Sequence, residues 1–335
     1  MKAVVLAGGS GERFWPLSTL ETPKQFLNMF GEQTLIEQTC QRLFMRLPPE
    51  DVLIITSKEH VKRTKDLLPD IPKKNIIGEP ERKNTGPACA LGALLSDPDE
   101  VNLIVPADHR ISDPSLFWDA FDKGLAALKE RNGLYTFGIH PKRPETGYGY
   151  IEAGENFAAD VYSVRSFREK PDRGTAERFV ADGDFYWNSG MFIWEASTFL
   201  EELKVCSPDI FVPMAGIDPR VRPQLEKAYR SLPVRSVDYA VMERSSKVMM
   251  IDGRFDWSDV GNWSSIIDLE GYTPSSDTSI LIDSDRVFIR STLKRPVGIV
   301  GLDGIVVIDT ENGLLICSEE QIQKVREISR SLRKT

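Results

Sequence analysis

Short apolar segments alternate with amphipathic segments along the first 140 residues. The apolar runs predict buried strands at Ala3–Ala7, Val52–Thr56, Val101–Val105 and Tyr135–Ile139, and the amphipathic runs predict helices at Thr34–Leu47, His60–Leu68, Pro87–Leu95 and Leu116–Lys129. This alternation is typical of an α/β fold with a Rossmann-like, mostly parallel mixed sheet flanked by helices. Because such sheets bind ligands beyond the carboxyl ends of their strands, residues that follow a strand are the first candidates for a site.

The rhythm changes after Gly147, where aromatic-rich stretches indicate mixed or antiparallel strands. A second change near Thr273 begins a series of short β-like pieces, at Ser279–Ile282, Val287–Arg290, Val297–Gly301, Ile305–Asp309 and Leu314–Cys317. A charged helix over Glu319–Leu332 follows them. We therefore expect two domains, residues 1–272 and residues 273–335, the second being a small β module with a terminal helix. A left-handed coil of short strands fits this module, although no strict repeat is visible.

Composition excludes several classes of function. The 335-residue chain carries a net charge of −8, which argues against a nucleic-acid partner because such proteins need a basic face. Its four cysteines are scattered without a CxxC pair, so neither a zinc site nor a disulfide framework is indicated. The chain has no signal-like segment and no run of about 20 apolar residues, so we expect a cytoplasmic protein without a membrane partner.

The first predicted strand runs directly into a glycine-rich turn with Gly8, Gly9 and Gly11, and two cations follow, Arg13 and Lys24. Such a turn lets backbone N–H groups approach an anion. The dinucleotide fingerprint fails because Phe14 stands at its last glycine, and the P-loop pattern fails because Arg13 stands at its second glycine. A tight turn without a ligand is the alternative, but the two cations favour an anion site.

The stretch LAGGSGERFWPLSTLETPKQF resembles the signature of the sugar-phosphate nucleotidyltransferases, L-A-G-G-x-G-x-R-x-x-P followed by P-K. The resemblance implies that a nucleoside triphosphate is wrapped by the backbone of this turn, at Leu6, Ala7, Gly8, Gly9 and Gly11. It also implies that Arg13 and Lys24 contact the phosphates and serve catalysis together with Lys170.

Asp108 and Asp259 are the candidate metal ligands. Asp108 follows a buried strand in PADHR, and Asp259 lies between two tryptophans in FDWSDVGNW. A turn aspartate and a helix cap are the structural alternatives at these positions. The resemblance favours metal binding, because both segments match its metal-binding regions. It implies Mg²⁺ or Mn²⁺ held between the nucleotide, on the side of Asp108, and the sugar phosphate, on the side of Asp259.

Three further motifs match the acceptor side of that family. FREKP carries Glu169 and Lys170, TGYGY carries Gly147 and Tyr148, and NSGMF carries Asn188. The resemblance implies that these residues bind the sugar phosphate. For Glu169 and Lys170 the alternative is a solvated surface pair, and for Asn188 it is a turn in an aromatic hairpin.

Base selection is expected from GEPERKNTGPACA, which contains Glu79, Asn84 and Thr85. Asn84 or Thr85 is also well placed to cap the following helix. The stretch resembles the guanylyltransferases that make GDP-mannose, and the end of the chain resembles theirs too. The implied substrates are GTP and mannose 1-phosphate. Two alternatives stay open: transfer of another nucleotide to a sugar such as glucose 1-phosphate, and a non-catalytic sensor of a nucleotide sugar. A small β module buries little surface alone, so we also expect a homodimer.

Overall fold

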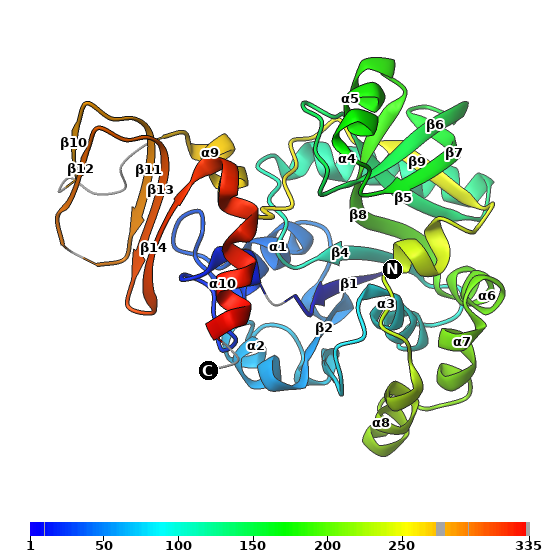
Figure 1. The fold of residues 1–335 in the computed structure, drawn as a ribbon. Helices are drawn as coiled ribbons and strands as arrows, with labels where there is room; N and C mark the ends of the chain where they lie inside the picture. Colours follow the sequence, from blue (N-terminus) through cyan, green and yellow to red (C-terminus); the bar gives the residue numbers. More distant parts are fainter. Residues whose placement is uncertain (10, 273–278, 294, 333–335) are drawn as a thin grey trace. The chain divides into compact units, whose positions relative to one another are not determined.

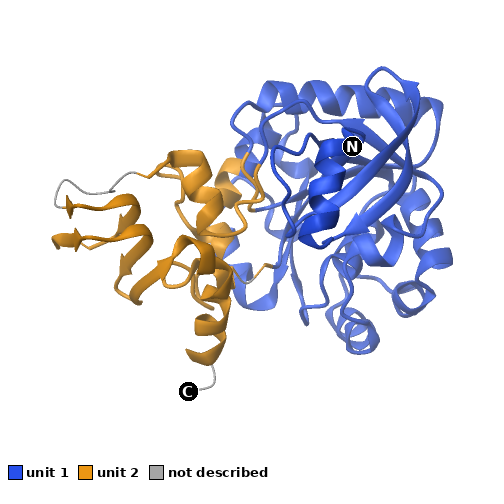
Figure 2. Cartoon of the chain, turned by 45° about the horizontal axis from the view of Figure 1, so that its top comes forward, with its two compact units in different colours: residues 1–8, 39–107, 111–257 blue, residues 9–38, 108–110, 258–335 orange. Residues whose placement is uncertain are grey.

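The computed structural model describes residues 1–9, 11–272, 279–293 and 295–332 (Figure 1). These residues form two compact units, which Figure 2 draws in different colours. Unit 1 comprises residues 1–8, 39–107 and 111–257, and unit 2 comprises residues 9–38, 108–110 and 258–335. The expected domain boundary after residue 272 adjoins residues 273–278, which lie outside the described part of the chain.

Unit 1 is built on one mixed sheet, which has nine strands among the described residues. The strands are β1 (Lys2–Ala7), β2 (Val52–Ser57), β3 (Ile76–Glu79), β4 (Val101–Pro106), β5 (Leu134–Ile139), β6 (Gly149–Ala158), β7 (Val161–Glu169), β8 (Phe185–Glu195) and β9 (Val248–Asp252). Their order is β3-β2-β1-β4-β8-β5-β9-β7-β6. Strands β1 to β4 pair in parallel, as do β5 and β9, whereas β6, β7 and β8 run antiparallel to their neighbours.

The order β3-β2-β1-β4 contains a switch point, because the chain moves outward from β1 on one side and returns to pair β4 on the other. Residues after β1 and β4 are adjacent there, and the Ala107 amide donates to the Leu6 carbonyl at 3.0 Å. Ligands of open α/β sheets bind at such points. Gly8, the first glycine of the turn, directly follows β1, at a strand end where the sequence predicts a ligand.

Helices cover both faces of the sheet. They are α2 (Val61–Leu67), α3 (Thr85–Leu94), α4 (Pro114–Glu130), α5 (Arg173–Asp182), α6 (Ala196–Cys206), α7 (Pro208–Met214), α8 (Arg222–Ser231) and a π-helix at Asp238–Met242, while α1 (Leu35–Phe44) includes the division between the units. Phe192 and Trp194 of β8 pack in the same cluster as α3 and α6. Ile193 instead lies under Gly124 of α4. Since successive strand residues point to opposite faces, α4 covers the face opposite α3 and α6.

Unit 2 combines the segment at residues 9–38 with α9 (Trp263–Glu270), strands β10 (Ser279–Ile282), β11 (Asp285–Ser291), β12 (Val297–Val300), β13 (Asp303–Thr310) and β14 (Gly313–Ser318), a 3₁₀ helix (Glu319–Lys324) and α10 (Val325–Leu332). Phe14 and Trp263 pack edge to face, with ring centroids 5.1 Å apart. Phe288 of β11 and Ile308 of β13 join the same buried cluster. One apolar core therefore holds the amino-terminal segment against the carboxy-terminal strands.

The carboxy-terminal strands form a coil rather than a meander. Strand β10 pairs in parallel with β12 and β11 pairs in parallel with β13. Ser279 pairs with Val297 and Asp285 with Asp303, so both offsets are 18 residues (297 − 279 and 303 − 285). The equal offset is the regular repeat that the sequence did not reveal. Val287, Ile299 and Val307 fill the interior of the coil.

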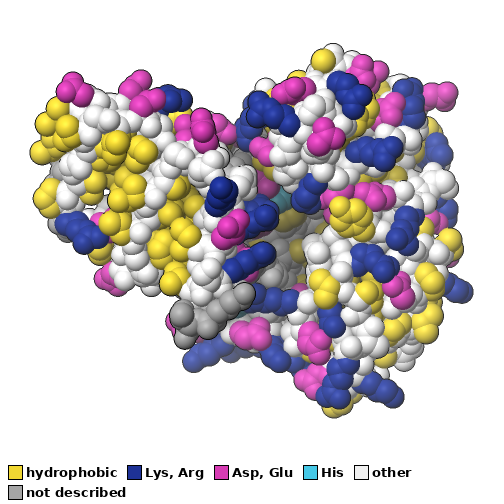
Figure 3. All heavy atoms as spheres, viewed as in Figure 1, with side chains coloured by type: hydrophobic (Ala, Val, Ile, Leu, Met, Phe, Trp, Pro, Cys, Tyr) yellow, Lys and Arg dark blue, Asp and Glu magenta, His cyan; other side chains and the backbone are white. Residues whose placement is uncertain are grey.

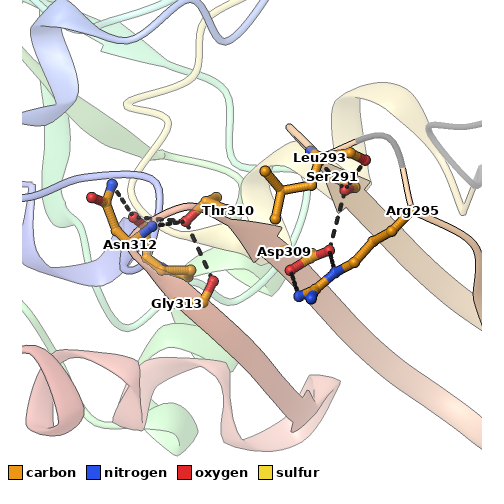
Figure 4. A network of polar contacts seen from close by, with 8 residues as sticks. Ser291, Leu293, Arg295, Asp309, Thr310, Asn312 and Gly313 are labelled. Atoms are coloured by element: carbon orange, nitrogen blue, oxygen red, sulfur yellow. Dashed lines mark hydrogen bonds and ion pairs between the residues drawn. The ribbon is translucent and has the colours of Figure 1, made fainter.

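A polar network fixes the amino-terminal segment to strands β13 and β14 (Figure 4). Thr310 and the Asn312 side chain both donate to the Pro16 carbonyl, at 3.4 and 3.2 Å. At the other end of the network, Arg295 forms a two-pronged ion pair with the buried carboxylate of Asp309. Pro16 lies three residues after Arg13, so the β module supports the part of the segment that carries this cation.

The predicted elements are largely confirmed. The expected strand at Ser279–Ile282 is found with those bounds. Strands β1, β2, β4 and β5 are each one residue longer than predicted, at one end only. The expected helix at Glu319–Leu332 is divided into a 3₁₀ helix and α10. In the described residues, no helix has the length and apolar character to cross a membrane.

Candidate active site

A pocket in unit 2 gathers six of the predicted site residues. Its volume is about 400 Å³, and it is lined by Gly9, Gly11, Arg13, Lys24, Asp108 and Asp259. These residues come from the segment after β1, which includes two short 3₁₀ helices, from the turn after β4 and from the segment before α9. The structure thus brings the predicted phosphate ligands and metal ligands of this unit into one cavity.

Lys24 is the central cation of this pocket. Its side chain is buried, its ammonium lies 2.9 Å from Asp108 Oδ2, and it also donates to the backbone carbonyl of Asp259. Burial alone would raise the pKa of Asp108, but Lys24, and His109 to a lesser extent, overcome this effect and lower it. Asp108 is therefore held as a carboxylate at neutral pH, the form that a metal ion requires.

Glycine is required at position 11 of the turn. Gly11 has φ +63°, and a Cβ there would lie 2.6 Å from the backbone nitrogen of Lys24. The turn can therefore press against the Lys24 backbone only because residue 11 has no side chain. Arg13 follows it and donates to the Gly261 carbonyl at 3.5 Å.

The donor set suits a hard divalent cation. Asp108 and Asp259 supply carboxylate oxygens, and Mg²⁺ commonly takes one or two carboxylates together with substrate phosphates. The described residues contain no group of three or more His, Cys, Asp or Glu side chains that could hold a metal. Buried Val260, next to Asp259, has φ +46°, a strained conformation for a β-branched residue of the kind found at functional sites.

The pocket is also lined by residues that were not predicted from the sequence, among them two arginines. Arg326 and Arg330 of α10 reach the same pocket, together with Glu12 and His109. Arg330 Nε lies 2.9 Å from Glu12 Oε2. In the sequence these arginines belong to a charged helix, which is usually a solvated surface. The only signal was their spacing of four residues, which places both on one helix face.

In unit 1, Leu6 and Ala7 end β1, Gly8 opens the turn, and Glu79 ends β3. Glu79 is 5% exposed, and Tyr229 donates a hydrogen bond to its Oε1 at 3.1 Å. Its other oxygen points to the turn, because a Cβ on Gly8 would lie 3.3 Å from Oε2. Burial raises the pKa of Glu79 to about 7, against the opposing effects of Tyr229 and Arg82.

Asn84 and Thr85 have structural partners in unit 1. Asn84 precedes α3 and accepts from the Thr85 amide at 2.8 Å, so the helix-capping alternative holds for Asn84. Thr85 Oγ1 accepts from the Val237 amide at 2.9 Å. These contacts fix the start of α3 and leave the predicted contact with a base as a hypothesis.

The predicted sugar-phosphate residues of unit 1 gather around strands β6, β7 and β8. Glu169 pairs in register with Gly149, and a Cβ on Gly149 would meet its carboxylate. Lys170 forms an ion pair with Glu169, and its amide donates to the Tyr148 carbonyl at 3.2 Å. Exposed Gly147 precedes Tyr148, whose ring packs edge to face with Trp187 and Trp257. Glu169 and Lys170 are thus a fixed pair whose carboxylate is nearly buried.

Asn188 of β8 is held by a carboxylate that sequence analysis missed. Its Nδ2 donates to Asp238 Oδ1 at 2.9 Å, and its Oδ1 accepts from Thr136 at 3.0 Å. Burial, followed by the nearby Glu169 carboxylate, raises the pKa of Asp238 to about 6. Asp238 opens the π-helix, an irregularity frequent at functional sites, but no motif marked it in the sequence.

Known protein families match nearly the whole chain. Residues 2–275 match the family model for nucleotidyl transferase, and residues 277–332 match the model for a MannoseP isomerase/GMP-like beta-helix domain. The mannose-1-phosphate guanylyltransferase ManC of Salmonella typhimurium is 39% identical over 97% of this chain and 72% of its own length. The mannose-1-phosphate guanylyltransferase of Escherichia coli K12 is 38% identical with the same coverage. A solved structure from Thermus thermophilus, described as a mannose-1-phosphate geranyltransferase, has a TM-score of 0.87 and 31% identity, and the match covers 99% of both chains.

Proposed function

Because the chain belongs to the nucleotidyl transferase family, we propose that it transfers GMP from GTP to α-D-mannose 1-phosphate, giving GDP-mannose and pyrophosphate. The chain is an enzyme of nucleotide-sugar biosynthesis, and the two guanylyltransferase relatives support this choice of substrates. The observation that carries the proposal is the unit 2 pocket, where Arg13, Lys24, Asp108 and Asp259 meet beside the glycine turn.

The proposed reaction is an in-line displacement. A phosphate oxygen of mannose 1-phosphate attacks the α-phosphorus of GTP, and the bond to the β-phosphate breaks with its electrons going to pyrophosphate. No covalent enzyme intermediate is needed. Both substrates are anions, so the protein's task is to bind them together and offset charge. Arg13 and Lys24 offset the charge of the triphosphate, and Lys170 positions the phosphate of the acceptor.

Nucleotidyl transferases of this family generally use a divalent metal. We propose Mg²⁺ here, with Mn²⁺ as the alternative, bound by Asp108 and Asp259 together with phosphate oxygens. When bound, it supplies positive charge at the α-phosphate, where negative charge develops during transfer. Lys24 then has a second role, because it orients the Asp108 carboxylate and joins it to the backbone of the segment that carries Asp259.

Glu79 is the proposed reader of the guanine base. The glycine turn wraps the nucleotide in this proposal, and Glu79 Oε2 points at Gly8 of that turn. Guanine presents two adjacent donors, N1–H and N2–H, and an ionised carboxylate accepts from both. Uracil and thymine lack this donor pair. Leu6 and Ala7 complete the backbone that leads into the turn, and Asn84 and Thr85 fix the start of α3 nearby in sequence.

Glu169, Lys170 and Asn188 are the proposed sugar-phosphate ligands, with Gly147 and Tyr148 offering backbone contacts. A carboxylate accepts hydrogen bonds from sugar hydroxyls, and an ammonium attracts the sugar's phosphate. The fixed Glu169–Lys170 pair and the oriented amide of Asn188 support these roles. Asp259 also belongs to this set through the metal that it shares with the acceptor.

The remaining parts of the proposal concern the domains, the oligomeric state and the location of the protein. We propose a catalytic domain at residues 1–272, a β module at residues 273–335, and a homodimer. Aliphatic side chains gather on the module (Figure 3), and Ile280, Val300 and Ile316 are 62%, 65% and 61% exposed. Exposed apolar groups of this kind favour burial against a second chain. All four cysteines are free thiols, which supports the proposed cytoplasmic location.

A substrate panel tests the proposed function. The full chain is incubated with Mg²⁺, each of four nucleoside triphosphates, and either mannose 1-phosphate or glucose 1-phosphate, and pyrophosphate release is measured. We expect the highest kcat/KM for GTP with mannose 1-phosphate. A different best pair would transfer the assignment to that pair. Binding of GDP-mannose without pyrophosphate release from any pair would instead identify a sensor.

A further inference from the structure

The terminal helix contributes two cations to the pocket of unit 2. Arg326 and Arg330 of α10 line the cavity that also holds Lys24 and Asp108. A different stripe of the helix region, with Ile322, Val325 and Ser329, is buried. Because residues four apart lie on one helix face, packing of the buried stripe presents both arginines to the same cavity.

The cations of the pocket differ in whether they have an ion-pair partner. Lys24 is paired with Asp108, and Arg330 is paired with Glu12 at 2.9 Å. For Arg326, the described part of the chain offers no hydrogen-bond or ion-pair partner, and its side chain is exposed to the cavity. A guanidinium directed into a phosphate-binding pocket is suited to an anion, because its planar donors match two phosphate oxygens at once.

We propose that Arg326 and Arg330 bind the β- and γ-phosphates of the nucleoside triphosphate, and hence the pyrophosphate that leaves. This inference rests on the proposed function, which it deepens by assigning residues to the leaving group. The candidate metal ligands Asp108 and Asp259 mark the α-phosphate, where the bond breaks. The β- and γ-phosphates extend from that point, and the arginines of α10 are additional cations within the same 400 Å³ cavity.

The carboxy-terminal region therefore takes part in catalysis as well as in structure. Charge on the β-phosphate increases as its bond to the α-phosphate breaks, and cations placed at the leaving group stabilise that change. Arg330 exchanges its partner when the triphosphate binds, giving up Glu12 for a phosphate oxygen. Arg326 has no such bond to give up, so its contribution to binding is the larger of the two.

In the reverse reaction, pyrophosphate and GDP-mannose are separate substrates, so binding of the leaving group is measured by a KM of its own. GDP-mannose lacks the β- and γ-phosphates of GTP, whereas pyrophosphate consists of them. For Arg326→Ala in the full chain, we expect the KM for pyrophosphate to rise about tenfold, because one charge-assisted contact is lost. We expect the KM for GDP-mannose to stay within about twofold. Arg330→Ala acts in the same direction with a smaller effect.

Lys324→Ala is the matched control, because Lys324 is an exposed cation just before α10 that does not line the pocket. Equal pyrophosphate KM values for wild type, Arg326→Ala and Lys324→Ala would overturn the inference, as would an equal rise for GDP-mannose and pyrophosphate.

Calorimetry with GTP and GMP tests the arginines without turnover. Arg326→Ala should weaken GTP binding about tenfold and leave GMP binding unchanged. Absence of turnover in the wild-type chain would refute the proposed function. Equal GTP affinity in the wild type and in Arg326→Ala would refute this inference.

Discussion

The ammonium of Lys24 lies 2.9 Å from a carboxylate oxygen of Asp108, although Lys24 begins a 3₁₀ helix and Asp108 follows β4. The same ammonium donates to the backbone carbonyl of Asp259. One buried cation thus contacts the carboxylate of Asp108 and the backbone of Asp259, and so joins the two segments that carry the candidate metal ligands. Groups that are positioned before the reaction need little rearrangement, which is the condition for strong electrostatic stabilisation.

Asp259→Asn tests the metal site. The amide keeps the shape of the side chain but removes a charge and weakens an oxygen ligand. We expect kcat to fall about 10²- to 10³-fold, while the dissociation constant of GTP changes by less than about threefold. Steady-state kinetics with varied Mg²⁺ and a separate GTP titration measure the two quantities. Asp268→Asn, an exposed carboxylate on α9, is the control. Wild-type turnover in Asp259→Asn would remove Asp259 from the metal site.

If Glu79 binds the guanine base as proposed, recognition of GTP should depend on pH. Burial is the main cause that raises the pKa of Glu79 to about 7, so the carboxylate is mostly ionised above that pH and mostly protonated below it. Guanine donates two hydrogen bonds, and the ionised form accepts both. Lowering the pH below about 7 should therefore raise the KM for GTP, approaching tenfold per pH unit. Glu79→Gln should bind GTP more weakly and lose this dependence.

The control for Glu79 is Glu81→Gln, which changes an exposed carboxylate two residues away. It should retain the wild-type pH profile of KM. The measurement is the KM for GTP between pH 5.5 and 8.5, values chosen to bracket about 7, with the stability of each variant checked at each pH. A pH profile in Glu79→Gln identical to that of wild type would show that another group titrates.

Asp238→Asn tests the orientation of Asn188. The carboxylate accepts from Asn188 Nδ2, whereas an asparagine at position 238 can present a donor there instead. We expect the KM for the sugar phosphate to rise about tenfold and the KM for GTP to stay unchanged. Glu201→Gln, an exposed carboxylate on α6, is the control. Equal changes in both KM values would assign Asp238 a general structural role.

The sequence predicts local features of the site better than its long-range partners. The turn after β1 and Asp108 after β4 were predicted because strand ends and glycine turns are visible in a short window. β3 was missed because it has only four residues, one of them glycine. Tyr229, the partner of Glu79, lies 150 positions away in the chain, and only folding brings it there.

Arg326 and Asp238 were missed for a related reason. Arginine on a charged helix is usually solvated, and aspartate in an unmarked segment usually lies on the surface. What makes these residues candidates is the pocket that α10 reaches and the amide that Asp238 contacts, both products of tertiary packing. The grouping of the amino-terminal segment with the β module was equally invisible, since it rests on a core shared by Phe14 and Phe288.

Because the amino-terminal segment and the β module share unit 2, we expect changes in the module to affect catalysis. Thr310 and Asn312 donate to the Pro16 carbonyl, three residues from Arg13 (Figure 4). The double variant Thr310→Val and Asn312→Ala should loosen this part of the segment and lower kcat/KM for GTP about fivefold, a loss of about 1 kcal/mol in transition-state binding. Arg295→Ala is the matched control, because it breaks the ion pair at the far end of the same network.

The two variants should separate stability from activity. Arg295→Ala leaves the buried carboxylate of Asp309 without its ion-pair partner, so its melting temperature should fall while its kcat/KM stays close to wild type. The Thr310 and Asn312 variant should lose activity at temperatures where it remains folded. Thermal unfolding and kinetics on the same samples make this comparison. If activity followed the melting temperature alone in both variants, the contacts with Pro16 would be structural, and the module would have no specific part in placing Arg13.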